Sequence, residues 1–127
     1  MRTARTWVWV EGQRVVAFYS VSAHQVVREA LPSRLGRGSP QAIPAVLLGK
    51  LALDLSLRGK GLGGELLVDA LERMVLAAQQ IAVRMVVVDA VDQKAVGFYE
   101  HFGFVKTAPG SFRLVRKVSD IERDLSA

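Results

Sequence analysis

The order of elements is decided by residues 45–79, which read AVLLGKLALDLSLRGKGLGGELLVDALERMVLAAQ. Ala45 to Leu53 is an almost continuous apolar run, of the length typical of a strand that is buried on both faces. Gly49 inside this run indicates a bulge or a close approach of another backbone. From about Gly61 to Gln79, apolar residues recur at helical spacing, which predicts an amphipathic helix. The stretch therefore predicts a buried strand, a glycine-rich turn and a helix.

The segments on either side predict further strands and helices. Before it, two β-branched and aromatic runs separated by Glu11-Gly12-Gln13 are typical of a hairpin, and a loop rich in Gly and Pro follows. After it, Asp92 is expected to cap a helix. The expected elements are strands at Thr6–Val10, Arg14–Val21, Arg84–Val88, Phe104–Lys106 and Ser111–Lys117, a loop at Ala30–Pro44, a helix ending near Phe102 and a last helical turn from Ser119. The order β-β-loop-β-α-β-α-β-β predicts one α+β domain, residues 1–127, with helices flanking a mixed sheet.

The composition narrows the function classes. The 127 residues include 17 Lys and Arg against 12 Asp and Glu, which gives a net charge of +5 and favours anionic partners. The chain has no Cys, which excludes a disulfide framework, a thiolate nucleophile and a Cys-ligated zinc site. His24 and His101 are too few and too far apart for a convincing metal site, so no metal is expected. No stretch reaches 18 uncharged apolar residues, so we expect a cytoplasmic protein that does not cross a membrane.

The strongest candidate for a ligand-binding segment is the turn Arg58-Gly59-Lys60-Gly61-Leu62-Gly63-Gly64. Glycines let the backbone turn sharply and approach a ligand, and the first amides of the following helix have no partner within the helix. This arrangement is suited to a pyrophosphate. The spacing does not fit a Rossmann fingerprint well, although Asp89 lies near the position of its acidic residue. It also lacks the Gly-Lys-Ser/Thr of a P-loop, and tight packing of strand on helix is a purely structural alternative.

Two motifs make the sequence resemble the GNAT superfamily of N-acetyltransferases. Residues 58–63 resemble that family's Q/R-x-x-G-x-G/A signature, and residues 92–104, DQKAVGFYEHFGF, resemble its N-x-x-A-x-x-F-Y-x-x-x-G-F segment. The segments at Ile43–Asp54, Gly61–Leu71 and Phe98–Phe104 resemble in particular the GNAT toxins of bacterial type II toxin–antitoxin systems. An Asp occupies the first position of the second motif, where most relatives have Asn. An ionised Asp accepts but does not donate hydrogen bonds, and it can still cap the helix.

The resemblance implies a GNAT fold, acetyl-CoA as co-substrate and a set of site residues. In this family the glycine turn holds the pyrophosphate, and a backbone N–H of the strand Leu51 to Leu53 polarises the thioester carbonyl. Tyr99 is the implied catalytic acid, since a phenol with a pKa near 10 stays protonated at neutral pH. Gly49 permits the splay of strands through which pantetheine enters. The cofactor-binding residues implied are Leu51, Ala52, Leu53, Arg58, Gly59, Lys60, Gly61, Leu62, Gly63, Gly64 and Asp92.

The toxin resemblance also implies an acceptor and a partner. These toxins acetylate the α-amino group of aminoacyl-tRNA, stop translation and pair with a ribbon-helix-helix antitoxin. Arg28, Arg34 and Arg37 are candidate tRNA contacts, and Arg113, Arg116 and Lys117 are further basic candidates that contact either tRNA or an acidic antitoxin tail. The strand Ala45 to Leu53 carries no carboxylate to act as a base. This mildly favours an α-amine, whose pKa of about 7.7–8.0 leaves a useful fraction neutral.

Two other functions remain open from the sequence. As alternatives to a tRNA-acetylating toxin, the protein is an N-acetyltransferase for a small amine or a protein N-terminus, or it is a non-catalytic protein that binds CoA or an antitoxin. Relatives carry a strand and one or two helices before the segment that starts here at about Arg5, so a shortened form is expected. Loss of such covering elements would favour a homodimer.

Overall fold

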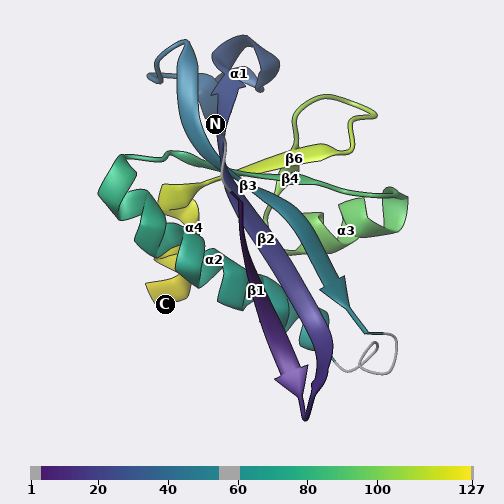
Figure 1. Cartoon of the computed structure of the whole chain (residues 1–127). Helices are drawn as coiled ribbons and strands as arrows, with labels where there is room; N and C mark the ends of the chain where they lie inside the picture. Colours follow the sequence, from purple (N-terminus) through teal and green to yellow (C-terminus); the bar gives the residue numbers. More distant parts are fainter. Residues whose placement is uncertain (1–3, 55–60, 127) are drawn as a thin grey trace.

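The computed structural model describes residues 4–54 and 61–126. Figure 1 shows one twisted sheet with helices packed against it. The elements are β1 (Ala4–Glu11), β2 (Arg14–Val27), a 3-10 turn η1 (Arg28–Ala30), α1 (Ser33–Gly36), β3 (Ala42–Leu53), α2 (Leu62–Ile81), β4 (Met85–Asp89), α3 (Gln93–His101), β5 (Val105–Lys106), β6 (Arg113–Lys117) and α4 (Val118–Ser126). No helix in the described ranges is long and apolar enough to cross a membrane.

The sheet is mixed, as the sequence predicts. Its six strands lie in the order β1-β2-β3-β4-β6-β5. Only β3 and β4, which α2 connects, pair in parallel, and the other neighbours pair antiparallel. The predicted hairpin, crossover and closing pair of strands are therefore confirmed.

Strands β3 and β4 separate beyond Gly49, and this opening positions the site. On one side of β3, Ser20 pairs with Lys50 but Val21 pairs with Leu48, so Gly49 is the extra residue of a β-bulge. On the other side, the ladder with β4 ends at the pair Leu48–Val88. From there β3 continues beside β2 while β4 runs toward α3 (Figure 1). The predicted bulge and splay of strands at Gly49 are confirmed, and the entry of pantetheine there stays a prediction.

Each face of the sheet buries its own apolar cluster. On one face α2, α3 and α4 cover side chains that include Leu48, Val86 and Val88. On the other, Leu31 and Leu35 from the η1–α1 segment cover Ile43 and Met85 at one end of the sheet only. The second face is therefore less covered toward the end where β3 and β4 separate.

The main differences from the predicted elements lie in β2, β3 and α4. β2 extends to Val27 and pairs with β3 as far as Ala42, so the predicted loop is shorter at both ends. Pro44 lies inside β3, one residue before the ladder with β4 begins at Ala45, and its carbonyl accepts a hydrogen bond from Arg84 N at 3.0 Å on that side. The missing N–H of Pro44 therefore removes no bond from the β3–β4 ladder. The predicted last turn is a nine-residue helix, held by the burial of Val118 and Ile121.

Candidate functional site

A cleft of about 460 Å³ opens where the end of β3, the start of α2 and α3 meet. Its described lining residues are Leu51, Ala52, Leu53, Gly61, Gly63, Gly64, Leu66, Asp92, Lys94, Ala95, Phe98 and Tyr99. The structure thus brings together residues from the two sequence motifs, which are about thirty positions apart. Of the predicted cofactor residues, Leu62 is half-buried at the first position of α2 and is not among the described lining residues. Arg58, Gly59 and Lys60 lie outside the described residues.

The N-terminus of α2 forms one wall of the cleft. Gly61, the N-cap residue, has a φ of 76°, in the left-handed region that favours glycine. It has no side chain with which to cap the helix, so the first amides of α2 keep their capacity to bind an anion. The helix dipole adds partial positive charge at the same place. This wall has the donor set of a phosphate site.

Gly63 and Gly64 let α2 approach α3 closely. A Cβ on Gly63 would lie 3.6 Å from Phe98 Cε1, which is ordinary contact, but a Cβ on Gly64 would lie only 2.8 Å from Phe102 Cζ. The packing alternative raised by the sequence therefore applies to Gly64. The same residue lines the cleft, so packing and access to a ligand coincide there.

Tyr99 stands at the inner end of the cleft. Its side chain packs edge-on against Phe98 and Phe104, with ring centroids 5.3 and 5.8 Å away. The residue is 7% exposed, and this burial raises the pKa of its phenol to about 12. The hydroxyl therefore remains a proton donor throughout the neutral range.

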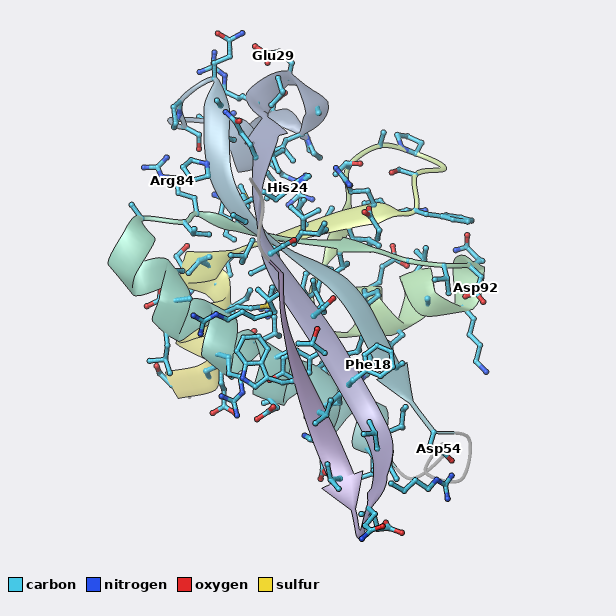
Figure 2. All side chains as sticks on the ribbon, in the orientation of Figure 1. Phe18, His24, Glu29, Asp54, Arg84 and Asp92 are labelled. Carbon is cyan, nitrogen blue, oxygen red and sulfur yellow. The ribbon has the colours of Figure 1, made fainter. Side chains whose placement is uncertain are left out.

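Asp92, labelled in Figure 2, is the N-cap residue of α3 and lines the same cleft. Its Oδ1 accepts a hydrogen bond from Ala95 N at 2.8 Å, so the predicted N-cap is confirmed. Opposite it, the edge of β3 from Gly49 to Ala52 faces away from β2 and has no partner strand among the described residues. That edge offers backbone groups to a ligand in the cleft.

A second hollow of about 270 Å³ adjoins the cleft at the splay. It shares Leu51, Ala52, Ala95 and Tyr99 with the cleft, so Tyr99 borders both spaces. Its other described lining residues are Phe18, Leu48, Gly49, Asp89, Ala90 and Val91. The sequence analysis did not assign Asp89 to this site. A carboxylate directly after the buried run Met85–Val88 is the signal that marks it, because residues at strand ends border the splay.

Asp89 belongs to a chain of three polar side chains. Arg113 donates to both of its carboxylate oxygens, from Nε at 2.7 Å and from Nη2 at 2.8 Å. Arg113 Nη1 also donates to His24 Nε2 at 3.2 Å. The hydrogen bond from Arg113 holds the pKa of the Asp89 carboxyl below its usual value. Asp89 is therefore ionised and fixed in orientation at neutral pH.

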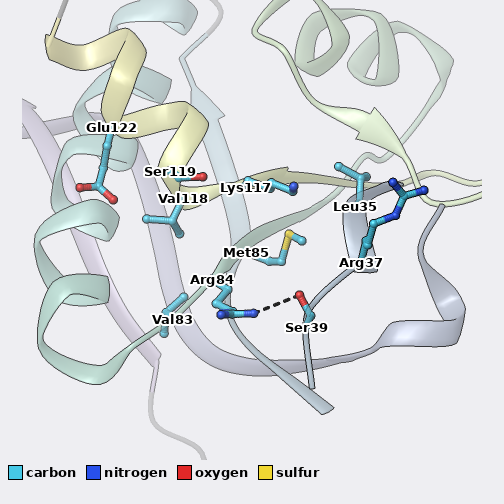
Figure 3. Close-up of a pocket in the computed structure, with 10 residues that line it drawn as sticks. All are labelled: Leu35, Arg37, Ser39, Val83, Arg84, Met85, Lys117, Val118, Ser119 and Glu122. Carbon is cyan, nitrogen blue, oxygen red and sulfur yellow. Dashed lines mark hydrogen bonds between the residues drawn. The ribbon is translucent and has the colours of Figure 1, made fainter. Parts of the chain in front are cut away.

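The predicted tRNA-contact arginines lie far from the cleft. Arg28, Arg34 and Arg37 are exposed in the η1–α1 segment, beside the start of β3. Leu51 lies nine positions after Ala42 in β3, which is about 30 Å at the usual rise of about 3.3 Å per residue. Arg37 borders a hollow of about 340 Å³ together with Arg84 and Lys117. Figure 3 shows Arg84 reaching across it to Ser39, whose Oγ accepts at 3.2 Å.

Two further basic candidates are engaged within the protein. Arg113 pairs with Asp89, and Arg116 pairs with Asp124 and packs over Gly103. The side chain of Arg116 is only 15% exposed. These two residues therefore serve intramolecular ion pairs, whereas Lys117 lies with Arg84 and Arg37 at the far end of the sheet.

Comparisons with known proteins agree with this geometry. Over 101 residues the chain is 40% identical to the tRNA-acetylating toxin of Mycobacterium tuberculosis, a match that covers 80% of this chain and 61% of that protein. The chain thus spans about three fifths of the length of this curated relative. One similar solved structure is AtaT complexed with acetyl-methionyl-tRNAfMet (TM-score 0.86, 27% identity, 96% of this chain and 75% of that chain).

Another is a mutant AtaT toxin bound to the C-terminus of the antitoxin AtaR and acetyl-CoA (TM-score 0.74, 25% identity, 89% of this chain and 65% of that chain). The fold expected from the sequence motifs is confirmed by these structures. A family model, the acetyltransferase (GNAT) domain, matches residues 2–106. Since that match covers most of the chain, this protein belongs to the GNAT family of acetyltransferase domains.

Proposed function

We propose that this chain is an acetyl-CoA-dependent N-acetyltransferase that acetylates the α-amino group of aminoacyl-tRNA in the cytoplasm and thereby blocks translation. The observation that carries the proposal is the cleft in which a glycine-capped helix N-terminus and the buried phenol of Tyr99 meet at an open strand edge. The names of a relative, a tRNA-acetylating toxin, and of a structural neighbour holding acetyl-methionyl-tRNA support the acceptor.

The cleft fits acetyl-CoA by its donor set. Acetyl-CoA would supply the acyl thioester. The amides at Gly61 to Gly64 would hold its pyrophosphate, because uncapped amides at a helix N-terminus bind anions, and Arg58 and Lys60 would add positive charge. The edge of β3 at Leu51 and Ala52 would hold the pantetheine arm and offer an N–H to the carbonyl. Asp92 would border the arm while capping α3.

Tyr99 is proposed as the general acid. Its position between the cleft and the adjoining hollow lets its hydroxyl reach the point where cofactor and acceptor meet. The amine nitrogen forms a bond with the acetyl carbon, the carbon–sulfur bond breaks, and the phenol donates its proton to the leaving thiolate. The amine releases its own proton to water.

The arginines at the far end of the sheet support a long anionic acceptor over a small amine. Arg37 borders one hollow with Arg84 and Lys117 and another with Arg28, and Arg34 lies in the same η1–α1 segment, so several cations gather at this end of the sheet. These residues lie about 30 Å from the cleft. An acceptor whose amine lies in the cleft therefore contacts them only if it is extended, as a nucleic acid is. We propose that they contact the phosphate backbone of the tRNA.

A protein partner is also proposed. The likeness to a toxin bound to the C-terminus of its antitoxin supports binding of an antitoxin, of the ribbon-helix-helix class by the resemblance of sequence. Such a partner should abolish acetylation when added in equimolar amount. A chain that stays fully active with its bound antitoxin would contradict this part of the proposal.

The central experiment uses labelled acetyl-CoA and total charged tRNA. We expect the labelled acetyl group on the amino acid of charged tRNA. Mild base should release the label together with the amino acid, and uncharged tRNA should not become labelled. Mass spectrometry of the released product should give an N-acetyl amino acid. Label on a polyamine or a peptide but not on any charged tRNA would favour the small-amine or protein N-terminus acetyltransferase instead.

A further inference from the structure

The hollow that adjoins the cleft has the chemistry of a site for an organic ammonium group. Its described lining is apolar apart from Asp89 and the hydroxyl of Tyr99. Phe18, Leu48, Ala52 and Val91 are among the apolar walls, and they come from β2, β3 and the segment that follows β4. A single carboxylate at the rim of an apolar hollow recognises a cation that carries an uncharged group.

The placement of Asp89 favours ligand binding over a purely structural role. Its backbone already pairs with Arg113 in the β4–β6 ladder, so the two strands do not need the side-chain bridge to stay together. Both side chains are more than a third exposed, and ion pairs of that kind contribute little stability. What the bridge does achieve is orientation, because a bidentate guanidinium fixes the plane of the carboxylate.

The carboxylate retains capacity for a further donor. A carboxylate has about four lone-pair positions, and Arg113 occupies two of them. With a side chain 46% exposed, Asp89 can accept a further hydrogen bond from an ammonium group in the hollow. His24 in turn holds the third nitrogen of Arg113, so the whole chain of contacts sets the position of Asp89.

We propose that this hollow is the acceptor subsite and that Asp89 binds the α-ammonium group of an aminoacyl ester whose side chain is uncharged. The inference rests on the proposed function and names its acceptor class. Acceptors with Asp or Glu side chains are disfavoured, because a second carboxylate in the hollow would lie beside Asp89. Asp89 is not the base: its pairing with Arg113 lowers its affinity for a proton, and the ammonium loses its proton to water once bound.

The first test compares the full-length Asp89→Asn variant with the wild type on methionyl-tRNA. We expect KM for the charged tRNA to rise about tenfold or more, as for loss of a hydrogen bond to a charged group. The acetyl-CoA affinity should change little, and kcat should not fall, because Asp89 favours the charged form of the bound amine and is not proposed to take its proton. Asp124→Asn, which breaks the ion pair between Asp124 of α4 and Arg116 of β6, is the matched control and should leave KM unchanged. Asp89→Glu should restore part of the affinity.

The second test measures binding without turnover. Calorimetry, carried out without acetyl-CoA so that no acetyl transfer occurs, compares two probes: tRNA carrying methionine through an amide link and the same tRNA carrying the matching hydroxy acid through the same link. The wild type should bind the amine probe about tenfold more tightly, and Asp89→Asn should lose this preference. Equal losses for both probes, or an unchanged KM in the Asn variant, would overturn the assignment.

A third outcome separates this inference from the function on which it rests. If kcat falls and the pH profile loses its acidic limb while KM stays constant, Asp89 is a base and the recognition role is wrong. If the folded wild type binds acetyl-CoA but acetylates no charged tRNA, the proposed function itself fails. If the wild type acetylates charged tRNA and Asp89→Asn has the same KM for it, only the role of Asp89 is refuted.

Discussion

At the scale of single residues, the proposed chemistry depends most directly on the hydroxyl of Tyr99. Tyr99→Phe should lower kcat by about 10²–10⁴-fold, the usual contribution of a general acid, because the change removes only the donated proton. The ring contacts with Phe98 and Phe104 do not involve the hydroxyl, so stability and acetyl-CoA affinity should hold. Calorimetry and steady-state kinetics on one protein batch measure both. Wild-type kcat in the Phe variant would reduce Tyr99 to a packing residue.

The raised pKa of Tyr99 makes a separate prediction. An acid must be protonated to act, so activity is lost only as the pH rises through its folded-state pKa, which lies at about 12. From neutral pH upward, kcat should therefore not begin to fall before about pH 10, which is the ordinary pKa of a tyrosine side chain. A pH profile in buffers of constant ionic strength tests this. A limb near pH 8 that disappears in Tyr99→Phe would contradict the burial argument.

Residues of the site differed in how far the sequence predicted them. Tyr99, Asp92 and the glycines from Gly61 to Gly64 fall inside motifs of fixed spacing, and the structure places them around one cleft. Asp89 and His24 belong to no motif, because they meet through the side chain of Arg113 across several strands. Such contacts depend on strand register and twist, which local sequence patterns do not contain.

At the scale of elements, the approach of α2 to α3 should control the cleft. A Cβ on Gly64 would meet Phe102, so Gly64→Ala should cost about 1–3 kcal/mol and weaken acetyl-CoA binding by displacing the start of α2. Chemical denaturation and calorimetry give the two quantities. Because the obstructing atom is the tip of one ring, Phe102→Leu in the same chain should recover part of both.

Gly97 supplies the matched control for this change. It lies in α3, is exposed, and has nothing within 4 Å of the position of a Cβ. Gly97→Ala should therefore stabilise the protein by about 0.5–1 kcal/mol, the usual helix preference of alanine over glycine. If both Ala variants are stabilised alike and bind acetyl-CoA normally, the close contact at Gly64 is not a constraint.

The elements themselves were largely predictable, and the errors share one cause. Runs with clear apolar periodicity, such as those of α2 and β4, appear within a few residues of the predicted bounds. The second half of β2 alternates Ser, His and Gln with apolar residues, and its pairing with β3 is long-range. The extension of β3 back to Ala42 depends on the same pairing, so it is decided by tertiary contact and not by local preference.

At the scale of the whole molecule, acyl chemistry and positive charge lie at opposite ends of the sheet. Leu51, near the end of β3, lines the cleft, whereas Arg34 and Arg37 lie in the segment that precedes the start of β3. Only a ligand that spans most of the sheet contacts both regions. The acetyl group and the bulk of the acceptor are therefore recognised by separate surfaces, and changes at one end should not alter the kinetics that depend on the other.

This separation predicts how salt acts on the reaction. Each phosphate contact releases condensed counterions, so log affinity for charged tRNA should fall with log salt by about 0.7–0.9 per contact. Replacing Arg34 and Arg37 together with Gln should raise KM for tRNA and reduce this slope by roughly 1–2. The value of kcat should change little, because neither side chain lies near Tyr99, and KM for acetyl-CoA should be unaffected. Arg123→Gln, which removes another exposed arginine, paired with Asp120 in α4, should leave the slope as it is. A slope that is the same in all three proteins would mean that the arginines of the η1–α1 segment do not contact the acceptor, and the basic end of the sheet would then have to serve another anionic partner.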